Sequence, residues 1–192
     1  MTENVQPHPS GTHRVRTIAV CGILILLLSA GSALLPILDR QAGARVVGIL
    51  LSGAGVLELI AGSQRREVKG LAMAAGGITL LAGLSFLLNP SGQFMPAAYL
   101  VMAWLFVRSL ILLVTVGGSH GSVRMWTAFS AAMDFLLGMF LLLGVSISAL
   151  ILSLFGPTAP LVATFAWVLA LSFVITGSLQ LEIASCERAA AE

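Results

Sequence analysis

GILILLLSAGSALLP, from Gly22 to Pro36, is the stretch that decides the fold class of this chain. It lies within an uncharged, apolar segment that runs from Thr17 to Leu38. A transmembrane helix needs about 20 consecutive apolar residues to cross about 30 Å of hydrocarbon. In lipid such a segment must be helical, because each backbone N–H and C=O group needs a partner within it. The stretch therefore predicts a membrane-spanning helix.

The same pattern occurs in five further segments, separated by short polar breaks. These segments are Ala44 to Gly62, Gly70 to Leu88, Met95 to Val116, one that begins near Met125, and Thr158 to Leu181. The chain of 192 residues is 58% hydrophobic and only 9% charged, whereas a soluble domain is about 25% charged. The composition excludes a water-soluble fold, and the sequence predicts an all-α, integral membrane bundle of six transmembrane helices.

The six spans are expected to form one membrane domain over residues 16–185. Residues 1–15 contain Pro7, Pro9 and Gly11 without a periodic apolar pattern, so we predict a disordered cytoplasmic tail there. Residues 186–192 are predicted to be a second cytoplasmic tail. Residues 145–157 exceed what one helix needs to cross the bilayer. They either extend the fifth helix or fold back along the membrane surface, and the sequence leaves both alternatives open.

An internal repeat is visible in the spans. GGITLLAGLSFLLNP, from Gly76 to Pro90, matches the first stretch in its leucines, its small residues and its closing proline. Pro36 and Pro90 are each followed, 19 positions later, by a small residue, Gly55 and Ser109 respectively. A third unit around Pro157 fits with stretched spacing. The pattern predicts three helical-hairpin repeats in parallel orientation, unlike the inverted repeats common in secondary transporters.

Basic residues indicate the orientation of the bundle. Six spans place both termini, the second loop and the fourth loop on one side. That side holds Arg14, Arg16, Arg65, Arg66, Lys69, Arg124 and Arg188, whereas the other holds Arg40 and Arg45. Cytoplasmic loops are enriched in Lys and Arg. We therefore predict a multi-pass membrane protein with both termini in the cytoplasm; the resemblance described below implies that the membrane is the bacterial plasma (inner) membrane.

No enzyme motif is present in the sequence, and we expect no catalytic, cofactor-binding or metal-binding residues. The three histidines lie outside the spans, and Cys21 and Cys186 form no metal-ligand pair. A disulfide between them is not expected on the cytoplasmic side. The net charge of +2 gives no argument for nucleic-acid binding. The expected partner is the lipid bilayer; any small-molecule or ion substrate is unknown from the sequence.

Two ionisable residues within the spans stand out, Arg108 and Asp134. Each lies eight residues from the expected cytoplasmic interface, or about 12 Å deep at 1.5 Å per residue. Their helices are consecutive and antiparallel, so we predict a buried ion pair, bidentate if the geometry allows. Such a pair either fixes the register of two helices or moves a proton or ion. The remaining alternative is no contact between the two residues, in which case Arg108 needs Glu58, a backbone carbonyl or a lipid headgroup as its partner.

Glu58 and Glu182 are candidate titrating carboxylates. Glu58 lies four residues before the cytoplasmic end of the second span, and Glu182 lies at the inner end of the sixth. Either both are interfacial carboxylates in wet headgroups, or they form an acidic cluster near the inner mouth of the bundle. Small residues crowd the second span (Gly48, Ser52, Gly53, Ala54, Gly55) and include Gly76 in the third. They allow close helix packing, either within one chain or in a homo-oligomer.

These residues together resemble the HdeD family of acid-resistance membrane proteins. The resemblance rests on the two repeat stretches, on VVGILLSGAGVLELI (Val46 to Ile60) and on AAMDFLLG around Asp134, and covers residues 16 to 185. It implies a non-enzymatic inner-membrane protein with a role in acid-stress resistance, but no mechanism. Arg108 departs from the small residues of the family pattern. A small transporter or channel using Arg108 and Asp134, and a membrane scaffold for a partner protein, are the alternatives.

Overall fold

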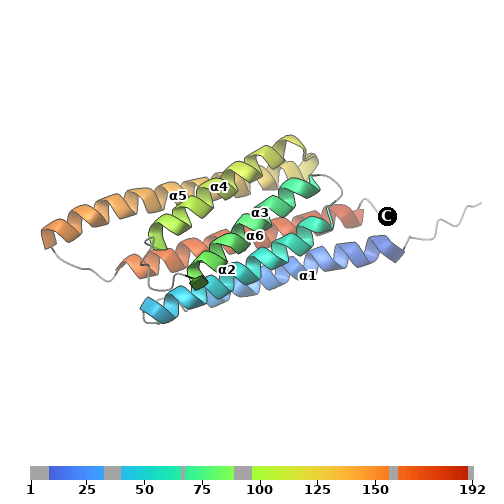
Figure 1. The fold of residues 1–192 in the computed structure, drawn as a ribbon. Coiled ribbons are helices and arrows are strands. Elements are labelled where there is room, and N and C mark those ends of the chain that lie inside the picture. Colours follow the sequence, from blue (N-terminus) through green and yellow to red (C-terminus); the bar gives the residue numbers. More distant parts are fainter. Residues whose placement is uncertain (1–8, 33–39, 66–67, 89–96, 156–159, 190–192) are drawn as a thin grey trace, which may run out of the picture.

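The fold of the chain, a computed structural model, is an all-helical bundle (Figure 1). The structure describes residues 9–32, 40–65, 68–88, 97–155 and 160–189. The helices are α1 (Pro9–Ser32), α2 (Arg40–Ser63), α3 (Lys69–Leu88), α4 (Ala97–Gly117), α5 (Gly121–Phe155) and α6 (Pro160–Ala189). Each contains a stretch long and apolar enough to cross a membrane. Together with exposed apolar side chains such as Leu27 and Leu110, this indicates a multi-pass membrane protein.

Two helix boundaries differ from the sequence-based expectation, and a third decides between two alternatives that the sequence left open. Helix α1 begins at Pro9, so residues 9–15, which we predicted to be disordered, are helical. The reason is tertiary packing, because Val15 is buried in a cluster with residues of α6. Helix α6 likewise continues to Ala189, into the predicted C-terminal tail. Helix α5 continues to Phe155, so residues 145–155 extend that helix; residues 156 and 157 lie outside the described part of the chain.

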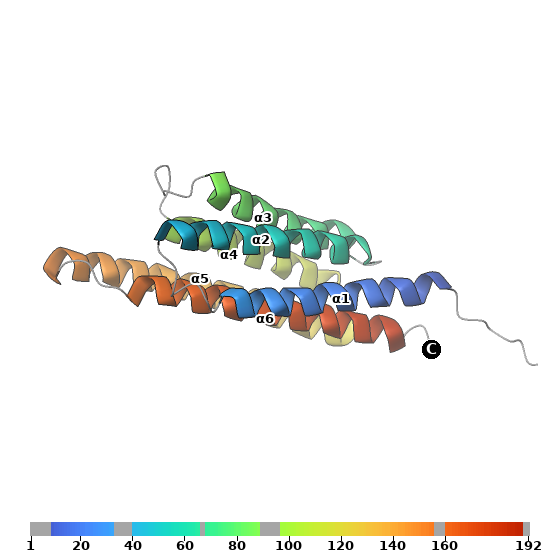
Figure 2. The same ribbon diagram turned by 90° about the horizontal axis from the view of Figure 1, so that it is seen from below.

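The helices form a ring in which close and looser neighbours alternate. The closest pairs are α2 with α3, α4 with α5, and α6 with α1, whereas α1 with α2, α3 with α4, and α5 with α6 pack less extensively. The start of α1 and the end of α6 lie at one end of the bundle, beside the α2–α3 and α4–α5 connections (Figures 1 and 2). We call this the terminal end and the opposite one the far end. The repeat hairpins expected from the sequence are thus not the most tightly packed units.

Glycines allow the helix backbones of two of these close pairs, α2–α3 and α6–α1, to approach each other. A Cβ atom on Gly76 of α3 would lie 2.7 Å from the backbone nitrogen of Leu59 in α2. A Cβ on Gly177 of α6 would lie 2.9 Å from the carbonyl oxygen of Gly22 in α1. Small residues allow this approach of helix backbones in membranes. The small residues of α2 and α3 therefore pack within one chain, which answers one of the questions that the sequence left open.

The far half of the bundle interior is a continuous apolar core to which all six helices contribute. We call it the far-half core. Its buried members are Ile25, Leu50, Leu51, Ala54, Phe86, Val101, Met102, Trp104, Leu105, Leu137, Leu141, Val168, Leu169 and Phe173. On α2, α3, α4 and α5 these residues lie on the far-end side of Glu58, Thr79, Arg108 and Asp134 respectively. The polar centre of the bundle is therefore closed from the far end.

Candidate functional site

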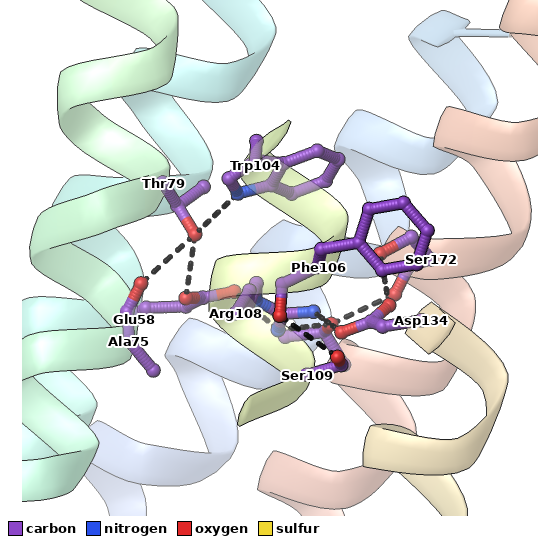
Figure 3. Close-up of polar contacts among 10 residues, drawn as sticks. Glu58, Ala75, Thr79, Trp104, Phe106, Arg108, Ser109, Asp134 and Ser172 are labelled. Carbon is purple, nitrogen blue, oxygen red and sulfur yellow. Dashed lines mark hydrogen bonds and ion pairs between the residues drawn. The ribbon is translucent and has the colours of Figure 1, made fainter. Parts of the chain in front are cut away.

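Arg108, in the middle of α4, is the centre of a buried polar network. Its side chain is 2% exposed and forms ion pairs with Asp134 of α5 and Glu58 of α2. The Arg108 Nη2 to Glu58 Oε1 distance is 2.9 Å, and Nη1 donates to Asp134 Oδ2. Figure 3 shows the guanidinium lying between the two carboxylates. The structure thus brings together Arg108 and Asp134, and adds a second acid to the pair.

The two acids divide the guanidinium fork between them. A bidentate pair with Asp134 alone, as expected from the sequence, does not form, because Nη2 faces the other way, toward Glu58. Helix α5 is a close neighbour of α4, whereas α2 is not among the main packing partners of that helix. Arg108 reaches Glu58 because its long side chain crosses the bundle interior. A guanidinium presents five donors in a rigid plane and suits such a divided role.

Hydroxyl groups of α6 complete the contacts on the Asp134 side. Thr176 Oγ1 accepts a hydrogen bond from Arg108 Nη2 at 2.7 Å and donates to the Ser172 carbonyl at 2.7 Å. Ser172 Oγ donates to Asp134 Oδ1 at 2.9 Å. Ser172 and Thr176 are one helical turn apart, so both face the same neighbour. Both carboxylate oxygens of Asp134 therefore have a donor.

The Glu58 side has its own donors, from α3 and α4. Thr79 Oγ1 lies 3.2 Å from Glu58 Oε2 and 3.0 Å from the Ala75 carbonyl, and shares its one proton between these acceptors. Trp104 Nε1 donates to the same hydroxyl at 3.1 Å (Figure 3). The Trp104 ring centroid is 5.8 Å from Arg108 Cζ, within the range of a cation–π contact. We define the Arg108 network as Glu58, Thr79, Trp104, Arg108, Asp134, Ser172 and Thr176.

The charges of the Arg108 network do not balance within it. It holds two carboxylates and one guanidinium, and all three side chains are at most 5% exposed. The Arg108 Nε has no hydrogen-bond partner among the described residues. Charges removed from water are stable only when they are paired and hydrogen-bonded. A network with one carboxylate in excess can therefore take up a proton, or a positive charge from outside it.

A second group of charges lies at the terminal end, which we call the end cluster: Arg14, Arg65 and Glu187. Arg14 of α1 forms an ion pair with Glu187 of α6. Arg65, just after α2, is only 8% exposed, and its Nε has no partner in the described structure. Burial lowers the pKa of Arg65 to about 10, although the carboxylates of Glu58 and Glu187 act in the opposite direction. Arg65 is thus a buried cation that interacts electrostatically with both acids but forms an ion pair with neither.

Glu182, the other candidate carboxylate, lies apart from the Arg108 network. It is partly exposed and accepts a hydrogen bond from Ser122 of α5. The Cys186 thiol lies 3.9 Å from Glu182 Oε1, and both cysteines are free. The acidic cluster of Glu58 and Glu182 that we considered does not form. Glu58 is 4% exposed in the bundle interior rather than an interfacial carboxylate.

Sequence reasoning named Glu58 as a partner of Arg108 only in place of Asp134, not together with it, and it missed the hydroxyls. Counting along the helix placed Glu58 about 6 Å deep and Arg108 about 12 Å deep. That estimate follows Cα positions and omits the reach of a side chain toward a neighbouring helix. The hydroxyls of Thr79, Ser172 and Thr176 were assigned to ordinary helix bonding. The spacing of Ser172 and Thr176, with no charge between them, was the signal for a polar face on α6.

Among the described residues, no group of three or more His, Cys, Asp or Glu side chains is placed to hold a metal ion. Comparisons of the chain with protein-family models, with curated proteins and with solved structures find no match. The arrangement of the Arg108 network is therefore the main structural feature that bears on function.

Proposed function

We propose that this chain is a non-enzymatic inner-membrane protein that supports survival at low pH, and that the Arg108 network is its proton-binding part. The observation that carries the proposal is the enclosure of two carboxylates with a single guanidinium in the middle of a membrane bundle. Ionisable residues at such depth are costly and usually functional. The resemblance to the HdeD acid-resistance proteins supports the same role.

The excess carboxylate gives the network two states that differ by one proton. In one state, Glu58 and Asp134 are both ionised, and the network needs a positive charge near it. In the other, one carboxyl is neutral and the guanidinium pairs with its partner alone. Since the three groups share hydrogen bonds with α3 and α6, a change at one acid alters contacts between several helices. Binding a proton would thereby change the bundle as a whole.

The three-hairpin repeat also belongs to this proposal, and the glycine contacts support it. In the repeat, Gly22 corresponds to Gly76, and Gly55 to Gly177. Gly22 of α1 packs against Gly177 of α6. Gly76 of α3 packs against Glu58 and Leu59, which follow Gly55 in α2. Three equivalent hairpins in a ring would give close and looser helix pairs in alternation, and the six helices alternate in this way.

A channel or transporter centred on Arg108 is the weaker alternative. Conduction requires polar positions stacked through the membrane. Among the described residues, the buried polar groups on the far-end side of the network are the hydroxyls of Ser29 and Ser32, which donate to backbone carbonyls, and Ser52 Oγ, which has no partner. The far-half core fills the remaining interior. The geometry favours a site that binds protons over one that passes ions, and offers no specific feature for a scaffold.

Survival at low pH tests the proposal directly. In a strain that depends on this protein, Glu58→Gln and Asp134→Asn should each reduce acid survival at unchanged protein level, because neither amide can bind the proton. Glu182→Gln is the matched control and should keep full survival, since Glu182 is outside the network. Survival like that of the unmodified protein in both network variants would remove these carboxylates from the mechanism.

Topology is a separate prediction, and it follows from the basic residues. In a cysteine-free background, Arg45→Cys at the far end should react with an impermeant maleimide added outside intact cells. Gly70→Cys, which is exposed at the terminal end and has open space around it, should react only after permeabilisation. A reporter fused after Glu192 should be active in the cytoplasm. External labelling of Gly70→Cys in intact cells would reverse the assigned orientation.

A further inference from the structure

The two ends of the bundle differ in what they place between the Arg108 network and water. Toward the far end, the interior is the apolar far-half core. Toward the terminal end, the buried residues include the cation Arg65, and also Ser130 and Gln180, each with a side-chain oxygen that has no hydrogen-bond partner among the described residues. Thr115, Ser119 and Thr127 are buried there too, but they donate to backbone carbonyls. A buried charge and two unpaired oxygens thus lie on the terminal side of the network, whereas the described residues of the far side include no buried charged side chain.

The charges of the network and of the end cluster form one alternating row. Ion pairs join Asp134, Arg108 and Glu58 in the bundle interior, and Glu187 and Arg14 at the terminal end; Arg65 interacts electrostatically with Glu58 and Glu187 but forms an ion pair with neither. We call this the charge row. It contains three carboxylates and three guanidinium groups, so the excess acid of the network is balanced by Arg65. The positive charge that the network needs thus comes from the residue that lies between it and the terminal end.

Helix geometry places Arg65 on the path from Glu58 to the terminal end. Arg65 follows Glu58 by seven residues, two helical turns, and its backbone continues the turn through a hydrogen bond to the Gly62 carbonyl at 3.2 Å. In a continuous helix, seven residues return to the same face about 10 Å further along; α2 ends at Ser63, so Arg65 lies two residues beyond the helix, near that position. Burial and electrostatic interaction with both Glu58 and Glu187 agree with this placement.

Helix α6 supplies a second polar line in the same direction. Ser172, Thr176, Gln180 and Glu187 are spaced by four, four and seven residues, so they share one face of the helix. Gln180 is 5% exposed, and its Oε1 accepts no hydrogen bond among the described residues. A buried acceptor without a donor usually indicates a water molecule or a mobile partner. Here it lies between the network and the end cluster.

We propose that protons reach Glu58 from the terminal end only, and that Arg65 is the counter-ion with which an arriving proton competes. This inference rests on the proposed function, and names the route and the control of the same site. A proton leaves a water molecule at the terminal end and binds a carboxylate oxygen of Glu58; no other covalent bond changes. Arg65 keeps its own proton and loses its partner, which favours its movement toward Glu187 or solvent.

The charged groups around Glu58 are few and come from identified elements. Arg108 of α4 forms an ion pair with Glu58. Asp134 of α5 and Arg65 of the α2–α3 connection interact with Glu58 electrostatically. On α3, the group that contacts Glu58 is the Thr79 hydroxyl. On α6, Thr176 contacts Arg108, and Glu187 interacts electrostatically with Arg65. Removal of Arg65 should therefore ease protonation of Glu58, because a nearby positive charge favours the ionised carboxylate.

Trp104 offers a reporter inside the network. It donates to Thr79, which in turn contacts Glu58. With Trp126→Phe and Trp167→Phe, Trp104 becomes the single tryptophan of the full-length chain. Its emission should change in one transition as the pH of the purified protein is lowered, and Glu58→Gln should remove that transition. No change in the Trp104 background would overturn proton binding by the network itself.

The role of Arg65 is tested in the same background. Arg65→Leu should move the transition to higher pH, whereas Arg65→Lys should hold it near its original position. Glu182→Gln keeps the charge row intact and should leave the midpoint unchanged. An unshifted midpoint in Arg65→Leu, in a protein that still shows the transition, would overturn the counter-ion role while leaving the proposed function standing.

Sidedness is measured in proteoliposomes of phosphatidylethanolamine and phosphatidylglycerol. The external pH is dropped in a stopped-flow instrument, and protease removal of a C-terminal tag gives the fraction of molecules with outward-facing termini. The fast change in Trp104 emission should match that fraction. A fast change that follows the opposite fraction, or the whole population, would overturn the access route alone.

Discussion

Arg108→Leu should destabilise the protein more than any other single substitution in the network. Leucine leaves two carboxylates buried without their guanidinium, and breaking a buried ion pair from one side typically costs about 3–5 kcal/mol. Thermal unfolding in detergent can be followed through Cys21, which is 4% exposed and should react with a thiol dye only on unfolding. Cys186→Ser removes the partly exposed thiol beforehand. Arg124→Leu, an exposed arginine on α5, is the control and should unfold near the temperature of the unmodified protein.

Removal of the acids should recover stability in steps. Arg108→Leu combined with Asp134→Asn leaves one unpaired carboxylate, and the further addition of Glu58→Gln leaves none. The triple variant should therefore be more stable than the double, and the double more stable than Arg108→Leu alone. Polar contacts between membrane helices average about 0.6 kcal/mol in double-mutant cycles, so part of the loss remains. Equal stability of the single, double and triple variants would show that the charges are not coupled.

Gly76→Ala should have the second large effect, through packing rather than charge. The new Cβ would lie 2.7 Å from the Leu59 backbone nitrogen and 2.9 Å from Glu58 Cβ, so α2 and α3 must move apart. Overpacking of this kind costs about 1–3 kcal/mol. Since Glu58 is carried on the displaced segment, Gly76→Ala should also alter the pH transition of Trp104.

The adjacent residue is the matched control. Gly77 is on the same helix, and a Cβ there has no atom within 4 Å. Gly77→Ala should therefore stabilise α3 by about 0.5–1 kcal/mol, because alanine is the better helix former. Unfolding temperatures in detergent, compared side by side, check both substitutions. Similar effects of Gly76→Ala and Gly77→Ala would contradict the close approach of α2 and α3.

The number and type of the helices could be predicted because lipid imposes helicity on any long apolar segment. Their ends could not, since α1 and α6 extend through Val15 and Ile183 packing on each other, a contact between opposite ends of the sequence. The proximity of Arg108 and Asp134 was predictable from equal depths on consecutive helices. The contact of Arg108 with Glu58 in addition to Asp134 was not predictable, because the Glu58 Cα lies at another depth and on a helix that is not adjacent to α4 in sequence.

The repeat shows the same division between local and distant information. Matching stretches such as Gly22 to Pro36 and Gly76 to Pro90 were visible along the chain. Which helix faces meet could not be predicted, because a hairpin pattern is equally compatible with tight packing inside each predicted hairpin or between hairpins. The packing between units that the structure has depends on Gly22 meeting Gly177 and on Gly76 meeting α2.

The tight pairing of α1 with α6 has a consequence for biosynthesis. Of the six helices, α1 is made before the others, yet its most extensive partner is α6, which is made after them. Until then, the glycine face around Gly22 has lipid or an insertase against it instead of Gly177. A nascent chain that has not yet reached α6 therefore cannot close the ring of six helices. The ring closes only when α6 has been made.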